Sequence, residues 1–317
     1  DITVFLNDGS AGDDDALTIL GTPDADTFVV NLANNGDDSG PLVDISGTLQ
    51  VETFSASTAD ARPSAGDLSP SQAPLEDLTI LTGAGDDTIQ VVGRTDGATT
   101  LTIDAGDPDA SDTLALDITT GNDSYTISRG DHAREGSVVV SLDGAVATQV
   151  NFDGIENISV DQLGLHASSG DGGTDLVTLN GTGGDDAISV SSITPDDLSA
   201  TVGNGPTITL DELGDGTTVT VSAAGGDDSL SLSTTNADDT IDYTANSATS
   251  ASLDVSDGTE TISFNIGGSE SLSIDTSGET STDVLNVTNA DAAVTSTGGG
   301  SGVVDPVDAA GAGLLSL

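Results

Sequence analysis

The chain of 317 residues has no cysteine, methionine, tryptophan or lysine. The lack of cysteine excludes disulfide bonds and thiolate metal sites. Zinc is further disfavoured because only two histidines, His132 and His166, are present, without metal-ligand spacing. No apolar run approaches the ~18 residues of a membrane span, and no positively charged signal segment opens the chain. We expect a mature or excised fragment of a secreted, extracellular or cell-surface protein.

Positive charge is also scarce. The cations are four arginines against 54 acidic residues, which gives a formal net charge of −50. A surface of this sign repels phosphate, so nucleic acid is excluded as a partner. Two explanations of the acidity stay open: the carboxylates hold divalent cations, or they form the acidic surface that suits a protein to a saline habitat.

Aromatic residues make up 2% of the chain and glycine contributes 40 residues, a composition that borders on that of disordered proteins. Apolar residues nevertheless reach 35%, and in many segments they alternate with polar ones, which is the period of a strand with one buried face. Aspartate outnumbers glutamate almost sixfold, and aspartate favours turns over helices. The sequence therefore predicts an all-β chain with almost no α-helix.

An internal repeat organises these strands. In four places the pattern Asp-x-apolar-x-apolar returns eleven residues later, and a threonine stands seven residues after the first aspartate of each pair. A glutamate-led strand such as Glu76–Ile80 precedes the pairs, and plainer strands such as Ser137–Leu142 and Thr259–Ile266 follow them. The chain is therefore read as a repeat protein. The aspartate pairs are Asp15 and Asp26, Asp112 and Asp123, Asp175 and Asp186, and Asp228 and Asp239.

The spacing within each pair predicts the fold. A parallel crossover within one sheet needs about a dozen residues or more, so strands eleven residues apart fit better on different faces of a winding coil. We predict a parallel β-solenoid, or β-helix, with units of about 55–60 residues, because stacked thin coils bury a narrow apolar stripe without a large core. Tandem β-sandwich domains are the alternative, although such domains need about 100 residues each.

The leading aspartates are separated by 97, 63, 53 and 55 residues, and the first unit carries a Ser/Ala/Pro-rich insertion near residues 55–74. We expect the chain to be a window from a longer array. Its expected divisions are the end of a preceding unit at 1–20, a unit with insertions at 21–118, units at 119–180, 181–233 and 234–288, and a degenerate or truncated unit at 289–317.

The electrostatics of such a stack predict a bound cation. Coils stacked at about 4.8 Å bring the turn carboxylates of successive layers together. Like charges that close raise carboxylate pKa values or push the layers apart, and four arginines are too few to neutralise them. Calcium is the natural counterion, since it takes six to eight oxygens in irregular geometry. Local hydrogen bonding is the alternative role of an aspartate at a turn.

The segment Thr82-Gly-Ala-Gly-Asp-Asp-Thr-Ile-Gln90 matches the nonapeptide G-G-x-G-x-D-x-U-x apart from its first glycine, and weaker copies begin at Asn180 and Ala223. The chain thus resembles the secreted calcium-binding repeat proteins of the RTX type, in which calcium is held between turns of a parallel β-roll. The resemblance implies Asp86, Asp87, Asp185, Asp186, Asp227 and Asp228 as calcium ligands. The same turn positions elsewhere add Asp107, Asp112, Asp123, Asp175, Asp238 and Asp239 as candidates.

No G-x-S-x-G, P-loop or HExxH motif is present, so we expect no enzyme. The sequence favours an extracellular, calcium-stabilised structural protein that forms or decorates a cell-surface layer or filament by associating with itself at its open sheet ends. A carbohydrate- or cell-binding adhesin module is the alternative, with a surface polysaccharide as partner, although exposed aromatics are scarce. A polysaccharide-active enzyme on a β-helix is less favoured, because Arg129 and Arg134 are the sole close pair of cations.

Overall fold

The structure is a computed structural model of the chain. It describes residues 16–31, 39–45, 49–54, 77–92, 100–106, 111–117, 123–142, 145–161, 176–193, 197–211, 213, 216–234, 239–247, 249–256, 258, 260–269, 271–275, 284–288, 303–305 and 315–316.

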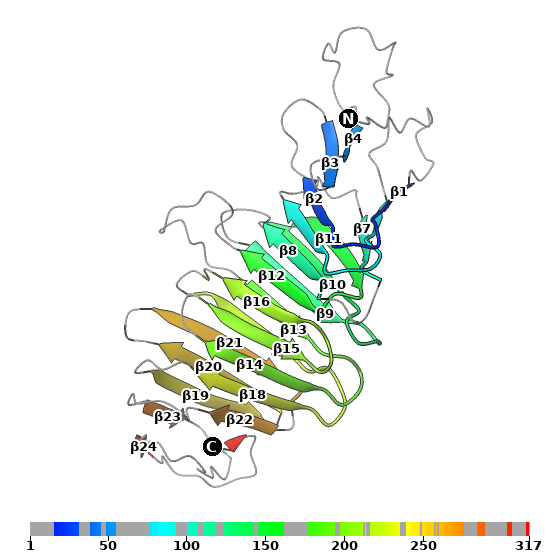
Figure 1. Ribbon diagram of the computed structural model, residues 1–317. Helices are drawn as coiled ribbons and strands as arrows, with labels where there is room; N and C mark the ends of the chain where they lie inside the picture. Colours follow the sequence, from blue (N-terminus) through cyan, green and yellow to red (C-terminus); the bar gives the residue numbers. More distant parts are fainter. Residues whose placement is uncertain are drawn as a thin grey trace.

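The described residues form strands and no helix, and the strands belong to two sheets (Figure 1). In spatial order the first sheet contains β1 (Ala16–Leu20), β5 (Asp77–Leu81), β7 (Thr100–Asp104), β11 (Ala145–Asp153), β10 (Gly136–Leu142), β9 (Asp123–Arg129), β13 (Leu176–Asn180), β17 (Thr218–Ser222), β21 (Thr261–Gly267), β20 (Ser250–Ser256), β19 (Thr240–Ser247), β23 (Val284–Thr288) and β24 (Val303–Asp305). The second sheet contains β25 (Leu315–Ser316), β22 (Ser271–Asp275), β18 (Ser229–Thr234), β14 (Ala187–Ile193), β15 (Leu198–Val202), β16 (Thr207–Asp211), β12 (Asn157–Asp161), β8 (Thr113–Asp117), β6 (Thr88–Val92), β2 (Thr27–Asn31), β3 (Ser39–Ile45) and β4 (Leu49–Phe54).

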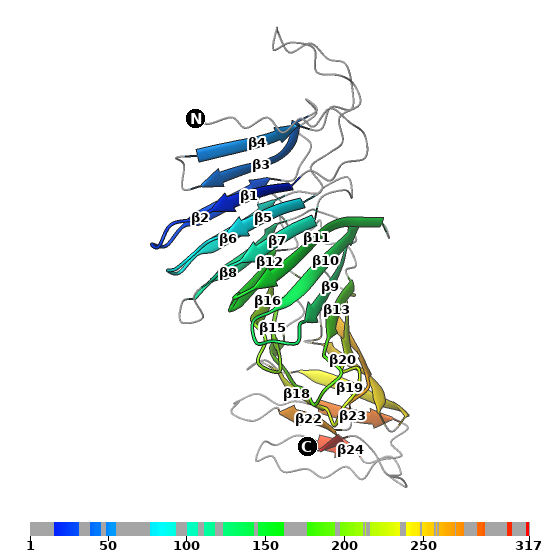
Figure 2. The same ribbon diagram turned by 90° about the vertical axis from the view of Figure 1, so that its right-hand side faces the viewer.

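The chain passes from one sheet to the other as it advances along the molecule (Figure 2). The two strands of each aspartate pair lie in different sheets: β1 and β2, β8 and β9, β13 and β14, and β18 and β19. Strands of successive passages pair in parallel, as β5 does with β1 and β6 with β2. The predictions of an all-β chain and of parallel pairing are therefore confirmed.

Three-stranded antiparallel segments interrupt this alternation, and they make both sheets mixed. The segments are β2–β4, β9–β11, β14–β16 and β19–β21, placed in turn in the second, first, second and first sheets. In the last three segments the third strand pairs in parallel with the strand that preceded the insertion in its sheet, as β11 does with β7. The strands predicted at Ser137–Leu142 and Thr259–Ile266 exist as β10 and β21, but the sequence analysis did not predict their antiparallel pairing.

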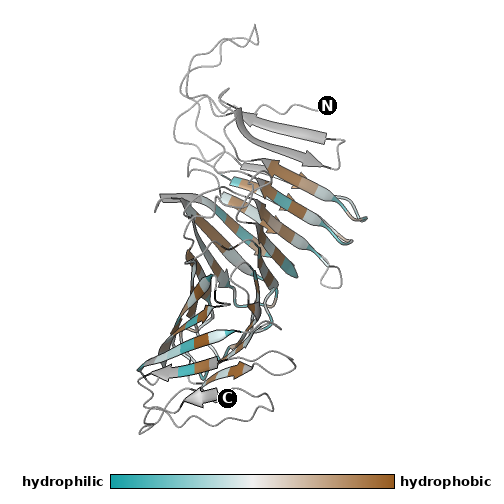
Figure 3. Ribbon diagram, turned by 90° about the vertical axis from the view of Figure 1, so that its left-hand side faces the viewer, coloured by the Kyte–Doolittle hydropathy of each residue, from teal (hydrophilic) through white to brown (hydrophobic). Residues whose placement is uncertain are grey.

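The core lies between the two sheets. Buried and exposed residues alternate along the strands, as in β7 and β17, and Figure 3 shows hydrophobic and hydrophilic positions alternating in the same way. Leucine, isoleucine and valine fill most inward positions, while Tyr125, Tyr243, Phe28 and Phe264 are the largest fully buried side chains. Within the described residues neither sheet closes on itself, and both contain strands from every expected unit from residue 21 onward. Within the described part of the chain there is no helix of the length and apolarity needed to cross a bilayer.

Candidate functional site

The aspartates that lead the strands of the second sheet occupy two environments. In the Gly-Asp-Asp turns that the structure describes, the second aspartate is buried, as for Asp87 and Asp228, whereas the first, Asp86 or Asp227, is exposed. Asp186 follows the same rule behind the exposed Asp185. A buried carboxylate needs hydrogen-bond donors or a cation, so its partners decide what the turn does.

The buried carboxylates form a ladder of hydrogen bonds across neighbouring turns, which we call the inner ladder. The backbone N–H of Asp26 donates to Oδ1 of Asp87 at 2.6 Å, and the N–H of Asp87 donates to Oδ1 of Asp112 at 2.7 Å. The N–H of Asp112 donates in turn to Oε2 of Glu156 at 2.7 Å. Each carboxylate thus accepts an amide hydrogen from the turn of the adjacent strand, in the order β2, β6, β8 and β12.

The exposed aspartates make the reciprocal bonds, which we call the outer ladder. The N–H of Ser111 donates to Oδ1 of Asp86 at 3.0 Å, and the N–H of Asp227 donates to Oδ1 of Asp185 at 2.9 Å. Beside the latter bond, the N–H of Asp186 donates to Oδ1 of Asp228 at 2.7 Å. Each of two adjacent turns therefore donates an amide hydrogen to a carboxylate of the other. We call this reciprocal pair of bonds a clamp; it provides acceptors for turn amides that lie outside the strand-to-strand hydrogen bonds.

The repeated threonine belongs to the same turn. The backbone N–H of Thr22 donates to Oδ2 of Asp26 at 2.6 Å, and the N–H of Thr182 donates to Oδ2 of Asp186 at 2.6 Å. The hydroxyl of Thr182 adds a second bond to Oδ2 of Asp186 at 2.9 Å. These contacts explain the threonine as a turn residue that holds the second oxygen of the buried carboxylate.

Two arginines stand where the inner ladder is interrupted. Strands β15 and β16 separate the turn of Glu156 from that of Asp186 in the second sheet. Pro206 precedes β16, and Asp197 precedes β15, which runs antiparallel to both of its neighbours. Arg134 places a guanidinium nitrogen 2.7 Å from Oε1 of Glu156, and Arg129 donates to Oδ1 of Asp186 at 2.6 Å. Both arginines come from β9 or the turn after it, in the first sheet, so they connect the two sheets while neutralising the ladder ends.

One oxygen of Asp87 and one of Asp112 are buried without a hydrogen-bond partner. Burial, together with the neighbouring charges of Glu156, Asp87 and Asp86, raises the pKa of Asp112 to about 6, against the lowering effect of the hydrogen bond from the Asp87 N–H. These two oxygens leave the turn stack with unused acceptor capacity. They suit a proton or a cation.

Two glycines make the close approach of the turns possible. Gly85 has φ +113° and Gly226 has φ +137°, the left-handed region that other residues avoid. A Cβ at Gly85 would lie 2.6 Å from the nitrogen of Ala25, and one at Gly226 would lie 2.6 Å from the carbonyl carbon of Gly184. Each of these glycines immediately precedes a doubled aspartate.

The structure brings together only some of the predicted calcium ligands. Asp86 and Asp87 meet Asp112, and Asp185 and Asp186 meet Asp227 and Asp228, while Asp239 is buried ahead of β19. Asp107, Asp175 and Asp238 lie outside the described residues, as does the side chain of Asp123 at the start of β9. Among the residues that are described, no three His, Cys, Asp or Glu side chains are grouped so that they could hold a metal ion. Calcium binding at these positions stays a prediction.

Arg129, Arg134 and Glu156 are site residues that the sequence analysis did not assign. Glu156 leads a strand in the repeat register, which was a usable signal for its place in the ladder. No sequence signal pairs the arginines with their carboxylates, because both pairs join different sheets.

Comparisons with known proteins add no relative: no family model matches the chain, and no match was found among the curated proteins or the solved structures.

Proposed function

We propose that the chain is an extracellular structural repeat protein, a stiff scaffold that associates with copies of itself in a cell-surface layer or filament. The observation that carries this proposal is the clamping of successive turns by paired carboxylates along two continuous sheets. Such clamps stiffen an elongated stack without forming a cleft around the carboxylates. On this proposal the chain is a two-sided β-solenoid, widened at intervals by the three-stranded segments.

The direction of the end strands supports head-to-tail association. In the first sheet β1 runs parallel to β5, and β24 runs parallel to β23. In the second sheet β25 runs parallel to β22. Stacking one copy on the next therefore joins strands of matching direction in the first sheet. A contact of this kind uses different surfaces on the two copies, so it does not close and generates a filament.

Calcium has a limited fit to the described residues. The donors are oxygens, which calcium prefers, and the free oxygens of Asp87 and Asp112 are buried. The other oxygens of these carboxylates already accept amide hydrogens, and the described carboxylates form no group of three. We therefore infer that a cation, where one binds, joins a pair of carboxylates and keeps water in its other coordination positions. It would add to the amide clamps and would not replace them.

The test of self-association uses an edge strand. The N–H of Gly21 donates to the carbonyl of Leu81, so alternation along a parallel strand directs the N–H of Ile19 to β5. The N–H of Thr18 then points to the other side of β1, where no described strand lies. Thr18→Pro removes this edge donor and leaves the pairing with β5 in place. Thr18→Val is the matched control, because it keeps the donor.

Sedimentation velocity and negative-stain electron microscopy of the full chain measure assembly in low salt, in high salt and with calcium. We expect assembly of the wild type and of Thr18→Val once added ions screen the charge of −50, and a monomer for Thr18→Pro. A wild-type chain that stays monomeric under all three conditions contradicts the proposal.

A further inference from the structure

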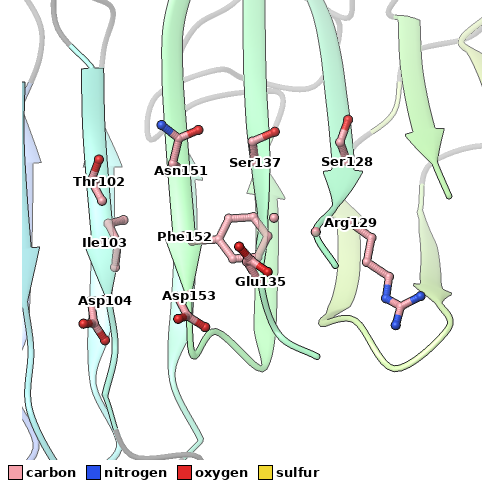
Figure 4. Close-up of a pocket in the computed structure, with 12 residues that line it drawn as sticks. Thr102, Ile103, Asp104, Ser128, Arg129, Glu135, Ser137, Asn151, Phe152 and Asp153 are labelled. Carbon is pink, nitrogen blue, oxygen red and sulfur yellow. The ribbon is translucent and has the colours of Figure 1, made fainter. Parts of the chain in front are cut away.

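A cleft of about 530 Å³ lies on the outer face of the first sheet, across β7, β11, β10 and β9 (Figure 4). Its volume falls within the range of about 300–1,000 Å³ that is usual for small-molecule sites. It is separate from the inner and outer ladders, which lie at the turns that lead into the second sheet. Hydroxyl, amide and carboxylate side chains are among its lining groups.

These groups lie in two rows that cross the strands. By pairing register, the first row is formed by Thr102, Asn151, Ser137 and Ser128. These side chains lie next to one another in Figure 4, and each carries both a donor and an acceptor. Neighbouring positions in such a row are about 4.8 Å apart, close to the spacing of two adjacent groups on a small polar ligand.

The second row carries negative charge and ends at a glycine. It contains Asp104 and Asp153, which are direct partners in the parallel pairing of β7 and β11, followed by Glu135 and Gly130. The Glu135 side chain folds over Gly130, where a Cβ would come within 2.8 Å of its Cγ, and Glu135 Oε2 accepts the N–H of His132 at 3.0 Å. The missing side chain at Gly130 thus leaves room that the Glu135 side chain occupies.

The charge of the cleft limits its ligand. Like charges in directly opposed positions repel, and Asp104 and Asp153 are opposed. The nearest guanidinium, that of Arg129, points away and pairs with Asp186 on the other sheet. The ligand should therefore supply hydrogen-bond donors to the carboxylates and carry no negative charge. A preformed metal centre does not explain the cleft, because the described carboxylates form no group of three.

We propose that this cleft binds a short segment of a non-acidic saccharide. Its hydroxyl groups donate to Asp104, Asp153 and Glu135, while the Asn151 amide and the three hydroxyl side chains both donate and accept. Phe152 lies beneath the cleft at 3% exposure, so its ring offers no stacking surface and recognition rests on hydrogen bonds. Affinity per site is then modest, and binding strengthens when many copies of the chain meet one polymer. The inference rests on the cleft alone and does not depend on self-association.

The experiment measures binding of defined oligosaccharides to the full chain by saturation-transfer NMR and calorimetry. The probes are neutral gluco- and manno-oligosaccharides, chitosan oligosaccharides, an acidic alginate oligosaccharide and a lysine-rich peptide. Asn151→Ala and Asp153→Asn change the cleft. Asn265→Ala and Asp254→Asn are matched controls, because both residues are exposed on the first sheet outside the cleft.

We expect a neutral or amino oligosaccharide to bind, the alginate probe not to bind, and each cleft variant to weaken binding by about tenfold while the controls stay within about twofold. Three results overturn the proposal: no saccharide binds at millimolar concentration, the controls weaken binding as much as the cleft variants, or the lysine-rich peptide alone binds. Far-ultraviolet circular dichroism of each variant excludes unfolding as the cause of a loss.

Discussion

The backbone N–H of Asp87 donates to Oδ1 of Asp112 at 2.7 Å, although the two residues are separated by 25 positions in the chain. The residues that precede them make the reciprocal bond, from the N–H of Ser111 to Asp86. A doubled aspartate is therefore a two-way clamp between neighbouring turns. For the aspartates that lead second-sheet strands, amide hydrogen bonding accounts for the repeated register, with or without a bound cation.

Removal of the buried clamp should cost more than removal of the exposed one. Asp87→Ala leaves the buried N–H of Asp26 without its acceptor, and we expect a loss of about 1–3 kcal/mol in the free energy of unfolding. Asp86→Ala removes the exposed bond to Ser111, where water replaces the carboxylate, so its cost should stay below about 1 kcal/mol. Urea denaturation of both variants measures the difference. Equal losses in the free energy of unfolding would show that burial does not make the inner-ladder bonds more important for stability than the exposed ones.

Asp112 should make the fold more stable as the pH falls. Its pKa is raised from 3.8 to about 6, so the folded chain binds the proton more tightly than the unfolded chain does. The contribution is therefore most favourable near pH 4 and below, and it is lost as the pH rises through about 6. Through Asp112 alone, the free energy of unfolding should be about 3 kcal/mol lower at neutral pH than well below pH 4.

Asp112→Asn isolates this effect. The amide oxygen still accepts the N–H of Asp87, and its NH₂ group replaces the unpartnered oxygen. We expect the variant to be more stable than the wild type at pH 7.5 and to lose that advantage by pH 4.5, as measured by urea denaturation. Calcium at this position would reverse the order, because it stabilises only the ionised wild type. If calcium makes the wild type more stable to urea than Asp112→Asn at pH 7.5, that result would support calcium binding at Asp112.

The sequence predicted the strands well because alternation of side chains along the chain directly reports one buried face. It also placed the paired strands in different sheets, since eleven residues are too few for a parallel crossover. The antiparallel segments were missed because alternation is the same in parallel and antiparallel strands. Hairpin signals were available in the turn Gly203-Asn-Gly205 between β15 and β16, in Asp143-Gly144 between β10 and β11 and in Asp257-Gly258 between β20 and β21.

The site was predicted less completely than the fold. The register identified aspartates that lie on adjacent turns. The sequence alone, however, does not distinguish a turn carboxylate that accepts amide hydrogen bonds from one that binds a cation. The partners of Arg129 and Arg134 depend on how the two sheets face each other, and a repeat pattern carries no information about that arrangement.

The Arg129–Asp186 pair should be a strong interaction. The Asp186 side chain has no exposed surface and that of Arg129 is 15% exposed, so Arg129→Gln leaves a buried carboxylate with two threonine donors and no cation. We expect a loss of about 3 kcal/mol in the free energy of unfolding. Adding Asp186→Asn should recover part of it, with a coupling energy of about 2 kcal/mol in a double-mutant cycle.

Arg134→Gln is the matched comparison, because Arg134 is 35% exposed where it meets Glu156. Solvent screens this pair, and its removal should cost about 1 kcal/mol or less. If Arg129→Gln and Arg134→Gln lower the free energy of unfolding equally, the buried Arg129–Asp186 pair is no stronger than the partly exposed Arg134–Glu156 pair.

Three consecutive residues in the turn before Asp227 should respond in different ways to substitution. Gly226→Ala forces a Cβ to within 2.6 Å of Gly184 at φ +137°, so we expect a loss of at least about 2 kcal/mol in the free energy of unfolding. A Cβ at Gly225 meets nothing within 4 Å, and φ there is not positive, so Gly225→Ala should be neutral or stabilise by up to about 1 kcal/mol. Ala224 has φ +69°, which glycine adopts without strain, so Ala224→Gly should be stabilising by about 1 kcal/mol. Urea denaturation of the three variants at one pH gives the order, and a Gly226→Ala variant as stable as Gly225→Ala would mean that adjacent turns do not approach as closely as described.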